Sequence, residues 1–339
     1  MTTMPLPTPR PLEESFADVV AQVLPVPGRS RAMIETLTLV ESLAGTDTNV
    51  LITGESGSGK ELIARLVHRT GGRTGTYLAH NCAAIAEGTL ESDLFGHAAG
   101  SFTGAVGTRR GLFEEADGGT VFLDEIGEIG GRLQAQLPRV RQEGEIRRVG
   151  ESRPRIVDVR VLAATNRDLA REVREGRFRE DLFYRLNVVQ VRVPPLRDRR
   201  TDVPLFLQCF LRESARAGET LAEAFRPEAV ERLLAYSWPG NVRQLRNEVL
   251  RAALVTRGRG PIGPEDFSEE LLETRSPDVR RGSFREQVDR AQRTIVLTAL
   301  RRSGWNKTHS ARELGITRQG LIKMIHRLGL PLEAPVAVE

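Results

Sequence analysis

One segment, residues 54–60, limits the possible folds of this chain more than any other. It reads Gly-Glu-Ser-Gly-Ser-Gly-Lys, follows a short apolar run at 50–52, and precedes a helical stretch at 61–67. Because glycine enters positive-φ conformations freely, the backbone N–H groups of such a loop can surround phosphate oxygens, and the helix N-terminus adds positive potential. Lys60 would then reach the β- and γ-phosphates of a nucleotide. The alternative, a glycine-rich turn with a solvated lysine, is disfavoured by the strand–loop–helix setting. The predicted nucleotide-binding residues are Gly54, Glu55, Ser56, Gly57, Ser58, Gly59, Lys60 and Glu61.

Short apolar runs alternate with helical stretches up to residue 193, as a parallel α/β sheet requires. The expected strands lie at 50–52, 77–79, 120–123, 159–163 and 188–191, and their brevity is typical of strands covered on both faces. After 194–195, which are both proline, only helical periodicity continues. We therefore predict a short N-terminal extension at 1–24, an α/β subdomain at 25–193, a helical subdomain at 194–267, a linker at 268–283 and a three-helix domain at 284–330.

The distribution of charge separates the C-terminal end from the rest of the chain. Residues 279–330 carry twelve Lys or Arg against three Asp or Glu, a net charge of +9, whereas the whole chain carries +4. A basic module joined to an acidic body is typical of nucleic-acid binding. The chain shows no run of 18 apolar residues and no secretion signal at its start, and its two cysteines have no metal-binding spacing. These features predict a cytoplasmic protein without a membrane segment.

Two carboxylates, Asp124 and Glu125, directly follow the apolar run 120–123. Ligands of parallel sheets bind beyond the C-terminal ends of the strands, so we expect Asp124 to bind Mg²⁺ and Glu125 to polarise the attacking water. Glu61 stands where the general pattern has Ser or Thr, and is a second candidate for holding the metal, directly or through water. Taken alone, an Asp-Glu pair is a turn cap about as often as it is a catalytic pair. Its combination with residues 54–60 favours the catalytic interpretation.

Other polar groups are ambiguous when taken alone. Thr165 and Asn166 end a strand, where a hydroxyl and an amide would lie near the γ-phosphate, but such residues more often form a turn or a helix cap. Arg179 and Arg185 are six residues apart, a spacing that favours no single helical face, and arginines usually form solvated salt bridges. Arg243 lies in the first turn of a helix, where a cation opposes the helix dipole unless an anion is bound.

The segment Gly100–Ala105, Gly-Ser-Phe-Thr-Gly-Ala, has glycines near both ends and an aromatic ring at its tip. A solvent-facing Phe102 on a flexible loop is poorly suited to a core and well suited to a partner. We predict that Phe102, Thr103 and Gly104 bind another protein.

Residues 306–330 have the pattern of a helix-turn-helix. Asn306 can cap one helix, Gly315-Ile316 forms the turn, and Thr317 can cap a second helix whose apolar positions Leu321, Ile325 and Leu328 share one face. The alternative is a basic, solvated helical hairpin. Apolar positions on the preceding helix, Val288, Ala291, Ile295 and Leu300, are candidates for dimer contacts. The predicted DNA-binding residues are Lys307, Thr317, Arg318, Gln319, Lys323 and His326.

Taken together, the segments 54–61, 100–105, 118–125, 164–169, 176–188 and 238–247 resemble the central AAA+ domain of bacterial enhancer-binding proteins, the ATP-driven activators of sigma-54 RNA polymerase. The C-terminal helices resemble the Fis-type module of that family. The resemblance implies an ATPase that uses ATP and Mg²⁺, binds enhancer DNA, forms a ring, which in the family pattern is a hexamer, and remodels sigma-54 polymerase through the loop 100–105.

The same resemblance assigns roles to single residues. It makes Arg179 and Arg185 arginine fingers that act on the ATP of a neighbouring subunit, Thr165 and Asn166 sensor I, and Arg243 sensor II. Asn81 takes the position that restrains the catalytic glutamate. Because no sensory domain precedes residue 25, control by a separate regulatory protein, by expression level or by DNA-driven assembly is expected.

The chain departs from the family pattern at several positions. Ser101 replaces alanine, Ala98-Ala99 replaces Glu-Lys, and Pro138 and Arg141 replace leucines. Proline inside a helix costs about 3 kcal/mol. Ser101, Pro138 and Arg141 support one alternative, a DNA-binding regulator with a weakened ATPase that acts by occupancy. The other alternative is an AAA+ remodeller of a different client.

Overall fold

The computed structural model describes residues 15–272 except 86, 103–104, 143 and 258, together with 296, 300, 303, 305–313, 317–327 and 330. Within these ranges, the side chains of Arg141, Gln142, Glu313, His326 and Arg327 are not described. The chain divides into two units, residues 1–272 and 273–339, and each unit is described here by itself.

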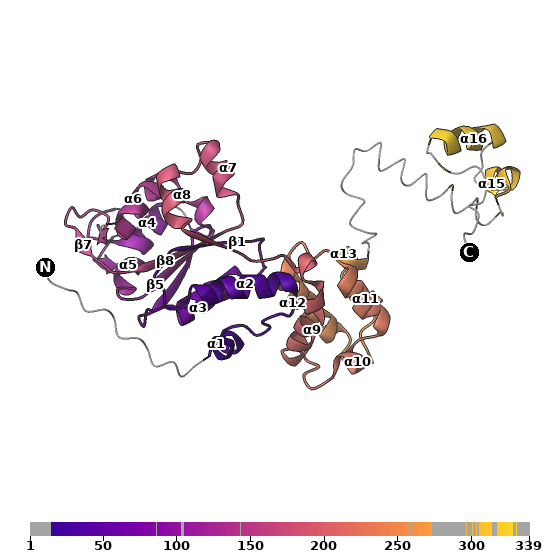
Figure 1. Cartoon of the computed structure of the whole chain (residues 1–339), viewed down its shortest axis with the longest axis horizontal. Helices are drawn as coiled ribbons and strands as arrows, with labels where there is room; N and C mark the ends of the chain where they lie inside the picture. The colour runs from indigo at the N-terminus through magenta and orange to yellow at the C-terminus, as the bar shows by residue number, and fades with distance from the viewer. Residues whose placement is uncertain are drawn as a thin grey trace. The chain divides into compact units, whose positions relative to one another are not determined.

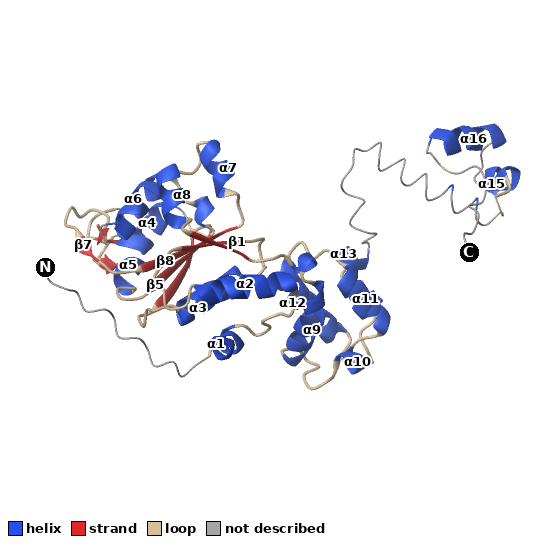
Figure 2. Cartoon of the chain, in the orientation of Figure 1, coloured by secondary structure: helices blue, strands red, loops and turns tan. Residues whose placement is uncertain are grey.

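Five parallel strands form the central sheet of the first unit, as predicted (Figure 2). Their order across the sheet is β2-β5-β8-β1-β9. All five fall on the apolar runs that the sequence indicates, which confirms the α/β class. The strands are β1 (Val50–Thr53), β2 (Tyr77–Asn81), β5 (Thr120–Asp124), β8 (Arg160–Thr165) and β9 (Val189–Arg192).

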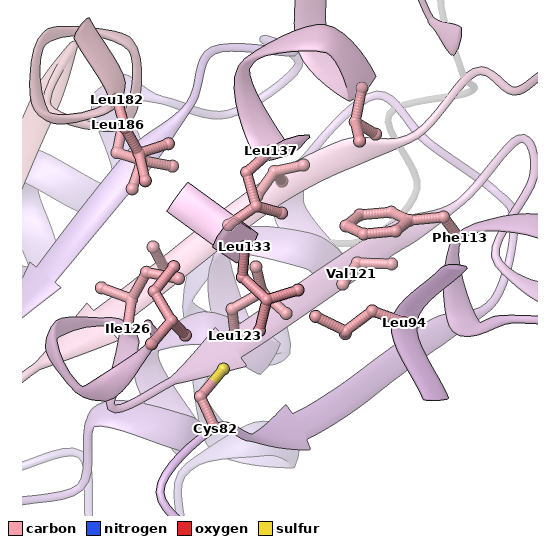
Figure 3. Packing of buried hydrophobic residues seen from close by; sticks show 14 of the residues in the cluster. Cys82, Leu94, Phe113, Val121, Leu123, Ile126, Leu133, Leu137, Leu182 and Leu186 are labelled. Carbon is pink, nitrogen blue, oxygen red and sulfur yellow. The ribbon is translucent and has the colours of Figure 1, made fainter. Parts of the chain in front are cut away.

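Helices cover both faces of the sheet, because alternate residues of each strand point to opposite sides. On one face Val121 and Leu123 pack against Leu133 and Leu137 (Figure 3). On the other face Phe122 packs in a separate cluster. The first face is covered by α4 (Glu87–Phe95), α5 (Leu112–Glu115), α6 (Gly131–Gln142), α7 (Leu169–Arg174) and α8 (Glu180–Leu186), and the second by α1 (Phe16–Val23), α2 (Arg31–Ser42) and α3 (Lys60–Thr70) (Figure 1).

Two short hairpins extend from the α/β subdomain. β3 (Gly96–His97) pairs with β4 (Arg109–Arg110), and β6 (Glu145–Ile146) pairs with β7 (Arg155–Ile156), both in antiparallel fashion. The two hairpins are joined, because Val149 forms a bridge with His97. The first hairpin therefore holds the base of the segment Gly100–Ala105 against the second.

In the described part of the chain, the rest of the first unit is mainly helical, around a core that contains the fully buried Trp238. Short 3₁₀ turns at Leu196–Asp198 and Arg200–Asp202 lead into it. A further 3₁₀ turn, Ile126–Glu128, follows β5, and another, Pro264–Asp266, precedes the last helix. The helices are α9 (Val203–Arg212), α10 (Leu221–Ala224), α11 (Pro227–Ala235), α12 (Asn241–Val255) and α13 (Glu269–Leu272).

The structure differs from the sequence-based boundaries at both ends of this unit. Within the predicted extension 1–24, Ser15 caps α1 and Val20 is buried against the α/β core. Within the predicted linker 268–283, α13 places Leu271 in the core of the helical subdomain. Both helices are short, and a short helix is stable mainly through the tertiary contacts that bury its apolar side, which sequence periodicity does not reveal.

Pro138 lies buried inside α6, and the helix continues through it to Gln142. The proline therefore removes one backbone hydrogen bond without ending the helix. The side chain of Arg141, the other departure in this helix, lies outside the described residues.

In the second unit, α15 (Lys307–Glu313) and α16 (Arg318–Arg327) form the expected helical pair. Asn306 Oδ1 accepts hydrogen bonds from the backbone N–H groups of Thr308 and His309, and Thr317 Oγ1 accepts one from Gly320 N. The predicted caps are thus present. Leu321 and Ile325 are buried with Val296, Leu300 and Ala311. Leu314, Gly315-Ile316, Leu328, Val288, Ala291 and Ile295 lie outside the described residues. In the described part of the chain, no helix has the length and apolar character needed to cross a membrane.

Candidate functional site

The loop between β1 and α3 has the backbone that its glycines predict. Gly57 and Gly59 adopt φ values of 74° and 106°, where an L side chain is strained. A Cβ at Gly57 would also lie 2.4 Å from the carbonyl oxygen of Gly240. Lys60 begins α3 and is 6% exposed; its Nζ lies 3.1 Å from Gly54 O and 3.5 Å from Glu125 Oε1. The loop and the lysine thus form a cationic cradle at the end of β1.

The two carboxylates at the end of β5 differ in their environments. Burial raises the pKa of Asp124, and the nearby Lys60 ammonium only partly offsets this effect. Glu125 has φ 53° and ψ 46°, a left-handed conformation that costs a non-glycine residue about 1–2 kcal/mol. Its carboxylate is held between Lys60 and the backbone N–H of Asn166, which lies 3.3 Å from Oε2. Strained residues with specific side-chain partners often mark functional sites.

The polar residues at the ends of the neighbouring strands lie at the same edge of the sheet. Asn81 pairs in register with Asp124, and its Oδ1 accepts a hydrogen bond from Ala83 N at 2.9 Å. Thr165 is fully buried at the end of β8, where its Oγ1 accepts a hydrogen bond from Arg167 N. Asn166 contacts Glu125 through its backbone. The structure therefore brings Asn81, Thr165 and Asn166 to the edge that holds the carboxylates.

The two predicted metal ligands, Glu61 and Asp124, differ in their side-chain contacts. Glu61 Oε1 lies 2.8 Å from Arg65 Nη2, so this carboxylate forms an ion pair along α3. Among the described residues, no group of three or more His, Cys, Asp or Glu side chains is arranged to hold a metal ion. Asp124 fits the usual mode of Mg²⁺, which binds one or two carboxylates together with the phosphates of its substrate and several waters.

The helical subdomain contacts the phosphate-binding loop through the start of α12. Val242 N donates to Gly57 O at 3.1 Å, and Arg243 Nη1 donates to Ser56 Oγ at 3.2 Å. Asn241 is fully buried, has φ 53°, and donates from Nδ2 to Ser56 O at 3.0 Å and to Glu55 Oε2 at 3.2 Å. Its Oδ1 accepts a hydrogen bond from Leu196 N at 2.8 Å. Arg243 therefore lies beside the loop.

Two arginines that the sequence analysis did not single out support the same loop. Arg197 forms a bidentate pair with Glu55, and this pair holds the pKa of Glu55 below its usual range. Arg199 is buried and donates from Nη2 to Ser58 O at 2.6 Å; burial lowers its pKa to about 10. Nothing in the local sequence distinguishes these arginines from the many solvated ones. The apolar residues around Arg199 become neighbours only in the folded chain.

A cavity of about 500 Å³ joins these groups. Its polar end is lined by residues of the loop 56–61 with Asp124, Glu125 and Arg243. Its apolar end is lined by Pro25, Val26, Phe206 and Phe210, which come from the N-terminal segment and the helical subdomain. One end thus suits phosphates and the other a flat apolar ring.

Arg179 and Arg185 do not line this cavity. Arg179 lies immediately before α8, and its guanidinium pairs with Asp181 at 2.9 Å on the surface. Arg185 is in the last turn of α8, and its backbone carbonyl accepts a hydrogen bond from Asn49 Nδ2. Both therefore lie outside the lining of this cavity.

The loop at Gly100–Ala105 presents its aromatic residue to solvent. Phe102 is 46% exposed, and its ring meets the edge of His97 at a centroid distance of 5.1 Å. Gly100 N donates to Ala105 O, which closes the base of the loop. Ala98 N donates to Val149 O. The Ala98-Ala99 pair, which replaces the Glu-Lys of the family pattern, is therefore supported by a backbone contact to the second hairpin. Thr103 and Gly104 lie outside the described residues.

In the C-terminal unit, the polar face of α16 is accessible. Arg318, Gln319 and Lys323 are exposed, as is the capping residue Thr317, and Lys307 is half-buried. The side chain of His326 lies outside the described residues. The face opposite the buried Leu321 and Ile325 therefore carries hydrogen-bond donors suited to bases and phosphates.

Three protein families match consecutive parts of the chain. The Sigma-54 interaction domain matches residues 26–192, the AAA+ ATPase lid domain matches 197–283, and the Bacterial regulatory protein, Fis family, matches 287–327. The chain belongs to the sigma-54-dependent transcriptional activators. This membership confirms the resemblance found in the sequence, including the lid and the helix-turn-helix, and makes the protein a transcriptional activator with a DNA-binding domain.

Individual relatives of this activator agree with the assignment. The transcriptional regulatory protein ZraR of Salmonella typhimurium is 46% identical over 301 residues, which cover 88% of this chain and 68% of ZraR. The transcriptional regulatory protein FlbD of Caulobacter vibrioides is 43% identical over 338 residues, covering 93% and 72%. The crystal structure of NtrX from Brucella abortus in complex with ATP is 33% identical, with a TM-score of 0.68 over 89% of this chain and 69% of that chain.

Proposed function

We propose that this activator binds Mg²⁺·ATP in the cavity between its two subdomains, assembles into a ring, and couples hydrolysis to remodelling of sigma-54 RNA polymerase. The observation that carries the proposal is the convergence of Lys60, Asp124, Glu125 and Arg243 on one cavity. The NtrX structure with bound ATP, which shares this fold, supports the same site.

Phosphoryl transfer requires that the reactants be positioned and that charge on the phosphates be stabilised, and different residues of the site serve each need. The loop N–H groups and Lys60 hold the β- and γ-phosphates. Glu125 polarises a water whose oxygen attacks the γ-phosphorus, the bond from that phosphorus to the β–γ bridging oxygen breaks, and ADP leaves with phosphate. A Mg²⁺ ion held by Asp124 would neutralise charge on the phosphates. Asn166 and Lys60 orient Glu125 before the reaction.

Completion of the site requires a second subunit. Arg179 and Arg185 lie away from the cavity of their own chain, which is the placement expected of residues that act on a neighbour's nucleotide. Such arginines increase the hydrolysis rate by about 10³–10⁵ in other nucleotide hydrolases. Hydrolysis would therefore depend on ring assembly.

The exposed Phe102 is the contact through which movement would reach sigma-54. Gly100 has φ 80°, and its N–H donates to Ala105 O, so the base of the loop is closed by a backbone hydrogen bond. The helix α16 would hold the activator on enhancer DNA, with Arg318 and Gln319 directed at base edges and Lys323 at phosphate.

Open-complex formation with purified sigma-54 polymerase tests the proposal. We expect wild-type protein to open promoter DNA with ATP and to fail with a non-hydrolysable analogue. Glu125→Gln should bind ATP but neither hydrolyse it nor open the promoter. Activation by Glu125→Gln at the wild-type level would instead favour a regulator that acts by occupancy.

The identity of the client is tested separately. Phe102→Ala should keep wild-type ATP hydrolysis and lose open-complex formation. Val106→Ala is a control, because Val106 is also an exposed apolar residue and lies just outside the loop. If Phe102→Ala activates sigma-54 polymerase normally, the loop acts on a different client.

A further inference from the structure

A buried amide on α6 holds the segment that carries Arg179. Gln134 is 3% exposed. Its Nε2 donates to Ile129 O at 2.9 Å and to Arg177 O at 3.1 Å, and its Oε1 accepts from Arg179 N at 2.7 Å. One side chain therefore holds three backbone groups, which belong to two separate segments, the first containing Ile129 and the second Arg177 and Arg179.

The contact holds the backbone of Arg179, whereas its guanidinium lies at the surface. The Arg179 side chain is 52% exposed and pairs with Asp181, which is 45% exposed. Exposed ion pairs contribute only about 0–1 kcal/mol, so the guanidinium can leave Asp181 for a stronger anion. The buried hydrogen bond to Gln134, by contrast, leaves an unpaired N–H if it is broken.

The same amide also reaches the segment that follows the catalytic carboxylate. Ile129 comes directly after the 3₁₀ turn Ile126–Glu128, which begins at Glu125. Gln134 thus ties the segment of Arg179 to a rigid part of the α/β core. An arginine that must meet a phosphate on another subunit needs such a support, because a misplacement of about 1 Å can lower a rate about 100-fold.

We infer that Gln134 is a positioning residue for Arg179, and that it acts on the nucleotide site of the adjacent subunit instead of on its own. The inference rests on the proposed function, in which Arg179 works across the subunit boundary. Removal of the amide should therefore produce the defect of a displaced arginine, even though Gln134 touches no nucleotide.

Steady-state ATP hydrolysis by the full-length chain measures the effect. Gln134→Met keeps the length of the side chain and removes its hydrogen bonds, and should lower kcat about 100-fold with little change in KM. Gln136→Met is the matched control, since Gln136 lies on the same helix and bonds Glu91, at 2.7 Å, and not the Arg179 segment. Its kcat should stay within about twofold of wild type.

Mixed assemblies show which site is affected. In an equal mixture of Gln134→Met and Glu125→Gln, about a quarter of the sites combine an intact Glu125 with an intact Arg179 segment from the neighbouring subunit. The ATPase activity of this mixture should therefore return to about a quarter of the wild-type value. In a mixture of Gln134→Met and Arg179→Ala, neither subunit offers a working arginine, so activity should stay low. Recovery in this second mixture, or failure to recover in the first, would overturn the inference.

A second variant keeps the test decisive if Gln134→Met does not fold. Gln134→Glu retains an oxygen that can accept from Arg179 N but turns a second oxygen toward the carbonyl groups of Ile129 and Arg177, so it should also lower kcat and show the same mixing pattern. A wild-type kcat in both variants would refute the role of Gln134. If Arg179→Ala itself hydrolyses ATP normally, the proposed function fails first; if Arg179→Ala is inactive and Gln134→Met is fully active, only the inference about Gln134 fails.

Discussion

Asn241 gives the strongest test of how the helical subdomain is joined to the phosphate-binding loop. Its side chain makes three hydrogen bonds across this junction, to Leu196 N, Ser56 O and Glu55 Oε2. It is fully buried, and its backbone has φ 53°. Asn241→Ala removes all three bonds and also places alanine in a conformation that it adopts poorly.

The structure sets the size of the effect. Three hydrogen bonds at about 1 kcal/mol each contribute about 3 kcal/mol to the free energy of unfolding. The left-handed backbone adds about 1 kcal/mol for alanine. A total of about 4 kcal/mol lowers the melting temperature of a domain of this size by roughly 10 °C. Asn241→Gly should be about 0.5–1 kcal/mol less destabilising, because glycine accepts the backbone conformation but is more disordered when unfolded.

Fluorescence of the buried Trp238 reports unfolding of this subdomain, and a Trp305→Phe background removes the other tryptophan. Asn247→Ala is the matched control, since Asn247 is exposed on the same helix. We expect the control to change stability by less than about 0.5 kcal/mol. If the free energy of unfolding of Asn241→Ala lies within about 1 kcal/mol of that of the control, the junction does not depend on Asn241. If alanine is better tolerated than glycine, backbone strain at position 241 does not contribute to the loss of stability.

Three further predictions concern separate parts of the chain. Because burial raises the pKa of Asp124, protons should compete with Mg²⁺ at higher pH than for a surface aspartate. Affinity for Mg²⁺·ATP should thus begin to fall at a higher pH than an ordinary aspartate would produce, and Asp124→Asn should remove this contribution in a binding titration. Pro138→Leu restores a backbone N–H inside α6 and should raise the free energy of unfolding by about 1–3 kcal/mol in urea titrations; a loss of stability would mean that the buried site has no room for leucine. Arg318→Ala should reduce discrimination between DNA sites by about 1–3 kcal/mol in binding assays, whereas Lys323→Ala should weaken all sites alike; a uniform loss for Arg318→Ala would assign it to phosphate.

Several features could be predicted from local sequence because local chemistry decides them. The glycines of residues 54–60, the strand runs and the caps Asn306 and Thr317 act within a few residues, so their patterns are visible in the chain itself. The parallel sheet followed from short apolar runs between helices, and its edge brought Asp124 and Thr165 together. The roles of Arg179 and Arg185 were implied only by the family resemblance, and they stay predictions.

Other features depended on tertiary structure because their partners are distant in sequence. Asn241 bonds Glu55 across 186 positions, and Gln134 bonds Arg179 across 45. A buried amide has no characteristic local pattern, since its partners are set by the packing of the segments around it. The same reason explains α1 and α13, two short helices whose buried residues contact distant parts of the chain. The sequence by itself thus determined the nucleotide loop, the sheet and the helix-turn-helix, while the folded chain decided how the loop, the helical subdomain and the segment of Arg179 are held in place.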